Sequence, residues 1–476
     1  AYILRMQDKK EEAQETIHYI QQIDPLDYWS AAEASLSASQ GASFLKAGTN
    51  HNSKGIIAIQ ELLEVVNNYM TIGATEDALT LLNSAISLGE PYASYPLLYY
   101  YKAYNLLKSK NSIEFQTCLD KARSLSPLNN YPFRIEEIAL FKTLLQKRPD
   151  DALLHYHLGN LLYFLGQKES GLEHWLHATE TDPSFAIAAR NVGFGYGCLN
   201  DLEKSIKYYD RAINANPNDP LLLTESDKIY EQANIPTDQR LKRLESHLKT
   251  VMKHDDAVMR LLTLYNAESK YDKSIKILNT RHFHLWEGGG QVHDIYADSH
   301  ILKGMQFLKR KQYKEAIREF DLANQYPSNL EVAPSPNGGY EAKIYYLSGI
   351  AYEAMKQTDK AKICFEKSAD THFRSHLTDL NYYKIKSLRK LNRNGEADVA
   401  LSNMQKTLER ILRNPTDSYA KFGEANQNVQ QSNISYYSGL IYLLQNNPSA
   451  AKNDFTQALQ LYPGNIWAQL MNKDIH

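Results

Sequence analysis

The sequence predicts an all-α protein built as a solenoid, which is a stack of short helical hairpins. The chain has 476 residues, whereas a single hydrophobic core stops growing at about 250–300 residues, so several domains or a repeat array are required. Glycine and proline, which interrupt helices, are few, at 22 and 16 residues. Small residues and prolines also recur with a spacing of 34 residues. A fixed period of this length is typical of a helical repeat.

The amino-acid composition excludes several classes of protein. Lys and Arg number 53 and Asp and Glu number 55, for a net charge of −2, so the chain lacks the basic excess of proteins that bind nucleic acid or anionic membranes. Hydrophobic residues at 43% and charged residues at 23% are ordinary values for a folded protein and exclude disorder. No apolar run approaches the ~18 residues of a membrane span. We therefore predict neither a nucleic-acid partner nor a membrane span.

The cysteines and the first residues bear on cellular location. Cys118, Cys198 and Cys364 lie far apart in the sequence, which excludes a disulfide framework and favours a reducing compartment. We predict a cytoplasmic location, with a periplasmic or surface-exposed location as the alternatives. The chain begins with Ala1 instead of methionine and is helical in pattern from the start. We expect it to be part of a longer protein.

The repeat is clearest where residues 155–183 are aligned with residues 189–217. The matched pairs are Gly159 with Gly193, Ala178 with Ala212, and Pro183 with Pro217. Small residues let two helices approach closely, and proline ends a helix because it lacks an N–H group. Further copies cover residues 300–327, 345–368 and 435–463, and degenerate copies precede residue 150. The pattern therefore predicts degenerate helical repeats in 1–150, central repeats in 151–281 and C-terminal repeats in 282–476.

This pattern resembles the tetratricopeptide repeat, a helix–turn–helix unit of 34 residues. The resemblance implies a right-handed α-α superhelix whose concave groove is lined by the first helix of each repeat and binds a protein partner. In the central repeats, the polar candidates on that helix are Asn160, Arg190 and Asn191. The paired lysines with which family members clamp a peptide carboxylate are missing there. Tyrosine pairs at residues 345–346 and 436–437 should each place one ring in the core, and the other ring either lines a groove or simply packs.

Two insertions interrupt the period, at residues 282–290 and 328–339. Both follow the second helix of a repeat, and equivalent junctions of a solenoid lie on one edge. We therefore expect the two insertions to be neighbours and to form one binding surface, since loops carry function more often than the scaffold does. A Trp–Glu pair on a glycine-rich loop suits the recognition of peptide or sugar. The predicted binding residues of this surface are His284, Trp286, Glu287, Gly288 and His293.

The first insertion leaves two other hypotheses open. His282, His284, His293 and Glu287 are residue types that bind zinc, but an HxH pair with a third histidine nine residues later is a weak motif. We predict no metal ligands and no cofactor. The other hypothesis is structural, with Trp286 tucked between repeats. No nucleophile elbow, P-loop, dinucleotide fingerprint or HExxH motif occurs in the sequence, so we predict no catalytic residues and no enzymatic activity.

Three passages also resemble one group of large bacterial proteins. They are IDPLDYW at 23–29, RHFHLWEGGGQVHDIYADSHILKG at 281–304 and ANQYPSNL at 323–330. Those proteins join an N-terminal β-rich domain of unknown function to a C-terminal tetratricopeptide array. The resemblance implies a non-catalytic scaffold that binds a protein partner or the missing N-terminal domain. Two alternatives are a carbohydrate-active protein whose saccharide pocket the Trp286 loop completes, and a surface glycan-binding helical lipoprotein.

Overall fold

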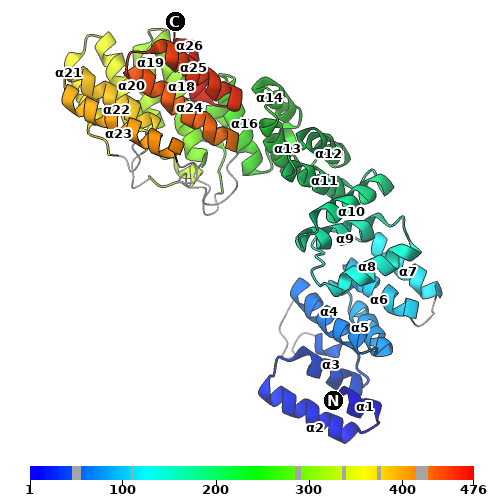
Figure 1. The fold of residues 1–476 in the computed structure, drawn as a ribbon. Helices are drawn as coiled ribbons and strands as arrows, with labels where there is room; N and C mark the ends of the chain where they lie inside the picture. The colour runs from blue at the N-terminus through cyan, green and yellow to red at the C-terminus, as the bar shows by residue number, and fades with distance from the viewer. Residues whose placement is uncertain are drawn as a thin grey trace. The chain divides into compact units, whose positions relative to one another are not determined.

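The protein is described from a computed structural model, which covers residues 1–45, 55–108, 112–284, 291–334, 339–372, 377–413 and 427–475. Over these residues the chain forms 26 α-helices and three short 3₁₀ turns, with no strand (Figure 1). The helices group into two compact units, Ala1–Leu199 and Asn200–His476, which are called unit 1 and unit 2 below. The divisions predicted after residues 150 and 281 separate degenerate repeats from well-formed repeats, not one compact unit from another. They stay a prediction.

Unit 1 consists of eleven helices among its described residues. They are α1 (Tyr2–Met6), α2 (Lys10–Ile23), α3 (Tyr28–Ser37), α4 (Ile56–Thr71), α5 (Thr75–Ser87), α6 (Pro96–Lys108), α7 (Ser112–Arg123), α8 (Glu136–Lys147), α9 (Ala152–Phe164), α10 (Lys168–Thr181) and α11 (Ala186–Cys198), with the turns η1 (Ser43–Leu45) and η2 (Tyr92–Ser94). Asp151 caps α9 by accepting hydrogen bonds from the N–H groups of Leu153 and Leu154, both at 3.0 Å. Such caps satisfy donors that have no partner within the helix.

Unit 2 continues the same succession of short helices. They are α12 (Leu202–Ala215), α13 (Pro220–Gln232), α14 (Thr237–Ser246), α15 (Leu248–Val251), α16 (Asp255–Ala267), α17 (Tyr271–Thr280), α18 (Gln291–Lys309), α19 (Tyr313–Ala323), α20 (Glu341–Ala354), α21 (Thr358–Ala369), α22 (Asp379–Lys390), α23 (Asn394–Arg413), α24 (Gln427–Leu444), α25 (Pro448–Leu461) and α26 (Ile466–Asp474), with the turn η3 (Ser328–Leu330). None of the helices in the described ranges is both long and apolar enough to cross a bilayer.

In several hairpins, a glycine on the first helix faces an aromatic ring sixteen residues later, on the second helix. In the α20–α21 hairpin, a Cβ atom on Gly349 would lie 2.5 Å from the ring of Phe365, and Gly439 has the same relation to Phe455 in α24–α25. A side chain cannot occupy that space, because protein interiors are close-packed. The glycines recognised in the sequence are therefore positions where two helices approach each other closely.

The first helix of these hairpins ends at a residue in the left-handed backbone conformation. Seven residues after the glycine stands a residue with positive φ, as at Gly166 (φ 85°), Lys356 (φ 61°) and Asn446 (φ 58°). Left-handed residues of this kind commonly end a helix. The turn to the second helix thus has the same geometry in successive repeats, which explains why the repeat length is preserved.

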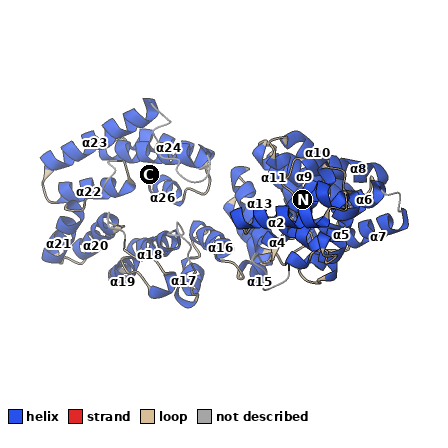
Figure 2. Ribbon diagram, turned by 90° about the horizontal axis from the view of Figure 1, so that it is seen from below, coloured by secondary structure: helices blue, strands red, loops and turns tan. Residues whose placement is uncertain are grey.

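Unit 2 curves so that its end returns to its beginning. In Figure 2 the helices α18, α20, α22 and α24 line the inner side of an arc, α19, α21 and α23 lie outside, and α26 lies within it. The hydroxyl of Tyr462 donates to Glu231 at 2.9 Å, and Lys309 forms an ion pair with Asp474 at 2.6 Å. These contacts join α25 and α26 to helices from the first half of the unit.

Candidate functional site

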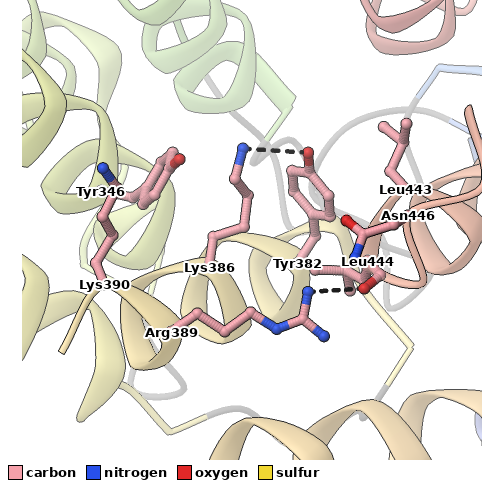
Figure 3. Close-up of a pocket in the computed structure, with 8 residues that line it drawn as sticks. All are labelled: Tyr346, Tyr382, Lys386, Arg389, Lys390, Leu443, Leu444 and Asn446. Atoms are coloured by element: carbon pink, nitrogen blue, oxygen red, sulfur yellow. Dashed lines mark hydrogen bonds between the residues drawn. The ribbon is translucent and has the colours of Figure 1, made fainter. Parts of the chain in front are cut away.

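A basic and aromatic pocket lies between three inner helices of unit 2, α20, α22 and the C-terminal end of α24 (Figure 3). Its volume is about 480 Å³, which falls in the range of small-ligand and side-chain binding sites. The described residues that line it are Tyr346, Tyr382, Lys386, Arg389, Lys390, Leu443, Leu444 and Asn446. The pocket thus combines three cationic side chains with two tyrosine rings, and this composition favours an anionic ligand.

Lys386 is the central cation of this pocket. Its Nζ atom lies 5.1 Å from the ring centre of Tyr346 and 5.3 Å from that of Tyr382, and 3.5 Å from the Tyr382 hydroxyl. Burial and the neighbouring charge of Lys390 lower the pKa of Lys386. Among the described residues, no carboxylate forms an ion pair with it. Lys386 is thus a partly buried cation that contacts aromatic rings and has no anionic partner in the described part of unit 2.

The two other cations are fixed by contacts at the rim of the pocket. Arg389 donates from Nη1 to the main-chain carbonyl of Leu444 at 2.7 Å, which ties α22 to the end of α24. Lys390 forms an ion pair with Glu353 at 2.6 Å. Each therefore holds its charge near Lys386, and only Lys390 has a neutralising partner among the described residues. The local excess of positive charge remains.

A second inner-face lysine in the same unit has an anionic partner, although its buried Nζ makes no hydrogen bond among the described residues. Lys343 is fully buried, forms an ion pair with Asp379 at 2.5 Å and lies 3.4 Å from the ring centre of Trp467. It therefore has both an anion and an aromatic ring. Lys386 has the two tyrosine rings and the Tyr382 hydroxyl, but no anion within the described ranges. The difference identifies Lys386, rather than Lys343, as the position where a ligand can supply the missing charge.

The three polar residues predicted from the central repeats, Asn160, Arg190 and Asn191, lie close together on α9 and α11 of unit 1. Asn160 Oδ1 accepts from Trp175 Nε1 at 2.8 Å and from Asn191 Nδ2 at 3.0 Å. Asn191 Oδ1 in turn accepts from Arg190 Nη1 at 3.0 Å, and Arg190 also lies over the ring of Phe194. These side chains form one hydrogen-bonded chain across α9 and α11. Their predicted role in binding stays a prediction.

The structure separates the residues predicted at the first insertion. Trp286, Glu287 and Gly288 lie outside the described residues. His284 is 80% exposed, whereas His293 is buried, stacked on Tyr326 with ring centres 3.8 Å apart. Its Nε2 is 3.1 Å from the Gln325 carbonyl oxygen, and burial lowers its pKa. His284 is thus exposed and His293 is buried, and their predicted role in binding stays a prediction.

The described ends of the two insertions lie side by side, as predicted. The N–H of Phe283 donates to the carbonyl of Asn329 at 2.9 Å. The Asn329 side chain donates to the carbonyls of Leu278 at 2.7 Å and Arg281 at 2.8 Å. His282 Nε2 also lies 2.8 Å from Glu331 Oε1. His282, His284 and Glu331 form the one group of three potential metal ligands found among the described residues.

Comparison with known proteins agrees with this architecture. The tetratricopeptide repeat family model matches residues 196–219 and 342–370. This chain carries tetratricopeptide repeats. The second match contains α20 and α21, so Lys343 and Tyr346 stand on the first helix of a recognised repeat. The predicted fold class is confirmed as an all-α array of tetratricopeptide hairpins, without a strand in the described part of the chain.

Solved structures of tetratricopeptide-repeat proteins are also similar to the chain. A MamA fragment from Desulfovibrio magneticus is 17% identical, with coverage of 41% of this chain and 93% of that one and a TM-score of 0.23. A tetratricopeptide repeat protein from Parabacteroides merdae is 15% identical, with coverage of 79% and 98% and a TM-score of 0.23. YrrB, described as having an unusual peptide-binding site, is 16% identical, with coverage of 48% and 91% and a TM-score of 0.21.

The basic pocket was missed by sequence reasoning because its central repeat was missed. The α22–α23 hairpin has Ile385 and Leu401 where its neighbour has Gly349 and Phe365, so the strongest mark of a tetratricopeptide unit is absent. A signal was nonetheless present, because Ala361 and Ala397 are 36 residues apart and so are Tyr346 and Tyr382. That register would have placed Lys386 on a first helix, with its side chain available to the inner face.

Proposed function

We propose that the chain is a non-catalytic scaffold that binds a protein partner on the inner face of unit 2, with a carboxylate of the partner entering the Lys386 pocket. The tetratricopeptide fold is typical of protein-interaction scaffolds. The observation that carries the finer proposal is the contrast between Lys386, which has no anion among the described residues, and Lys343, which has Asp379.

A carboxylate suits this pocket for electrostatic reasons. An opposite charge beside a partly buried cation offsets its desolvation and favours its charged form. A hydrogen bond to a charged group contributes about 1.5–3 kcal/mol, more than a neutral one. Arg389, which bonds a carbonyl group and has no ion pair among the described residues, adds positive potential at the rim, and this steers an anionic segment toward the pocket. The tyrosine rings supply apolar area of the kind found at the centre of protein interfaces.

The test is a peptide selection on the full chain. Twelve-residue peptides are selected from a random displayed library and resynthesised with each Asp, Glu or C-terminal carboxylate replaced by its amide. We expect one carboxylate in the selected peptides whose replacement weakens binding about tenfold or more, as a charged hydrogen bond implies. Lys386→Met should cause a similar loss, and the two changes together should cause little more than either one.

A matched control is available on the outer side of the same unit. Lys362 on α21 is 69% exposed, so Lys362→Met removes one positive charge without touching the pocket and should leave peptide affinity unchanged. Selected peptides that need no carboxylate, or that bind Lys386→Met as tightly as the original chain, would overturn the proposal. The saccharide alternatives depend on Trp286, and no described contact favours them.

A further inference from the structure

We propose that His282, His284 and Glu331 form a binding site for a divalent transition-metal ion, Zn²⁺ above all, that fastens the two insertions to each other. The proposal is independent of the Lys386 pocket. Each residue offers one ligand atom, and these atoms all lie within 4.8 Å of one another. Two imidazoles and one carboxylate are a common zinc ligand set.

The distances between the ligand atoms are close to those of a tetrahedral zinc site. Zinc binds nitrogen and oxygen ligands at about 2.0–2.2 Å, so two ligand atoms around one ion are separated by about 3.3 Å. His282 Nε2 lies 2.8 Å and His284 Nδ1 lies 3.9 Å from Glu331 Oε1. These two separations lie on either side of the required value. The proposal requires only that these exposed side chains rotate enough to place all three atoms around one ion.

The first half of the site is built on a fixed main chain. Phe283 is fully buried between the two histidines, and residues in an extended segment alternate in direction, so His282 and His284 both point outward. Asp255 holds this segment in place. It pairs with Arg281 at 2.6 Å and accepts the N–H of His284 at 2.9 Å. The histidines are therefore positioned by buried and ion-paired neighbours rather than by each other.

The second half is equally fixed and comes from a different insertion. Leu330 is fully buried, and the side chain of Asn329 bonds two carbonyl groups of the first segment. Glu331 has φ 52°, in the left-handed region that reverses the chain direction and is uncommon for a residue with a side chain. The turn brings its carboxylate to the histidines, although Glu331 follows His282 by 49 residues.

The expected coordination has an open position. Three protein ligands leave one of the four tetrahedral positions for water or for a group of a bound partner. The three side chains are between 40% and 80% exposed, so an ion can enter from solvent. Imidazole ligands favour Zn²⁺, Cu²⁺ and Ni²⁺ over Mg²⁺ and Ca²⁺, which prefer oxygen. The inferred role is to bind the ion and to join the insertions, with no reaction attached.

The test uses the full chain without an affinity tag, stripped of metal with a chelator and titrated with ZnCl₂ in a calorimeter. We expect one saturable site per chain. His284→Ala and Glu331→Gln should each weaken it about tenfold or more, the size of effect that perturbing a metal site produces. Co²⁺ should give the visible absorption of a four-coordinate ion with the original chain and lose it in both variants.

A control separates this site from general binding by surface histidines. His177 is 63% exposed and lies in unit 1, so His177→Ala should leave the Zn²⁺ affinity unchanged. The original chain showing no saturable site would overturn the proposal. So would unchanged affinity in both His284→Ala and Glu331→Gln. His284 is exposed enough that its loss should not unfold the chain. If the melting temperature of the metal-free His284→Ala variant nevertheless shifts, the Zn²⁺ affinity of Glu331→Gln is the result that tests the proposal.

Discussion

The carboxyl group of Asp298 should make the stability of unit 2 depend on pH in an unusual direction. Burial raises its pKa from 3.8 to about 7, and its Oδ1 has no hydrogen-bond partner among the described residues. The groups that face it come from four helices. Lys343 lowers the pKa, Asp379 and Asp294 raise it, and a hydrogen bond from Trp467 lowers it.

The sign and size of the effect follow from linkage. Because the folded-state pKa is raised above the unfolded value, this group favours folding fully below about pH 4, and the contribution is lost as the pH rises to about 7. A shift of about three units at 1.36 kcal/mol per unit amounts to about 4 kcal/mol. Asp298→Asn removes the titration. The free energy of unfolding of Asp298→Asn minus that of the original chain should rise by about 2–3 kcal/mol between pH 5 and pH 8.

Urea unfolding followed by circular dichroism at pH 5, 6, 7 and 8 measures this difference. Only its change with pH matters, so a constant offset caused by the amide has no bearing on the result. Asp272→Asn serves as the control, because it removes one negative charge from a side chain that is 89% exposed. A difference between Asp298→Asn and the original chain that stays flat from pH 5 to pH 8 would refute the reasoning, since it would mean that Asp298 ionises as freely in the folded state as in water.

Two further predictions concern packing and buried charge in unit 2. Gly349→Ala should destabilise the chain by about 1–3 kcal/mol, because its Cβ would lie 2.5 Å from Phe365 and overpacking costs that much. Gly395 has open space around it, so Gly395→Ala should not destabilise the chain. Equal melting shifts in the two variants would contradict the packing argument. Asp227→Ala should cost about 3–5 kcal/mol, because it removes the more deeply buried of the two carboxylates that Arg240 and Arg260 share, and leaves them Glu231 alone among the described residues. A urea midpoint shift no larger than that of Glu366→Ala, at an exposed pair, would show that the ion pair is unimportant.

The hairpins could be predicted from the sequence because their marks are local and steric. Gly349 and Phe365 are needed for two helices to meet, and the same need produces Gly439 and Phe455. The α22–α23 hairpin was not predicted because it lacks this steric requirement. With Ile385 at the glycine position the two helices pack less closely, so a different set of side chains fills the space and no fixed pattern is required. A repeat can be recognised only where its packing constrains residue identity.

The neighbouring insertions were predicted from repeat register alone, and the contact between Phe283 and Asn329 confirms it. The ligand set that we propose for them could not be predicted in the same way. The sequence offered Glu287 and His293 as partners for His284, because they are close along the chain. Among the described residues, which do not include Glu287, the structure places Glu331 beside His282 and His284 and buries His293. Proximity in the sequence is a poor guide to coordination once the chain reverses direction between the two residues.

Polar side chains on the first helices of the repeats look alike in the sequences of the two units. In the structure they differ in whether their hydrogen-bonding and charged groups already have partners. In unit 1, Asn160 and Asn191 use their oxygen atoms within one chain of hydrogen bonds that ends at Arg190, so a ligand would have to compete with bonds already made. In unit 2, Lys386 contacts aromatic rings and has no anion among the described residues. A ligand carboxylate would add an interaction there without breaking one. We therefore prefer unit 2 as the proposed binding surface, because Lys386 can accept a ligand carboxylate as a new partner, whereas Asn160 and Asn191 are already hydrogen-bonded.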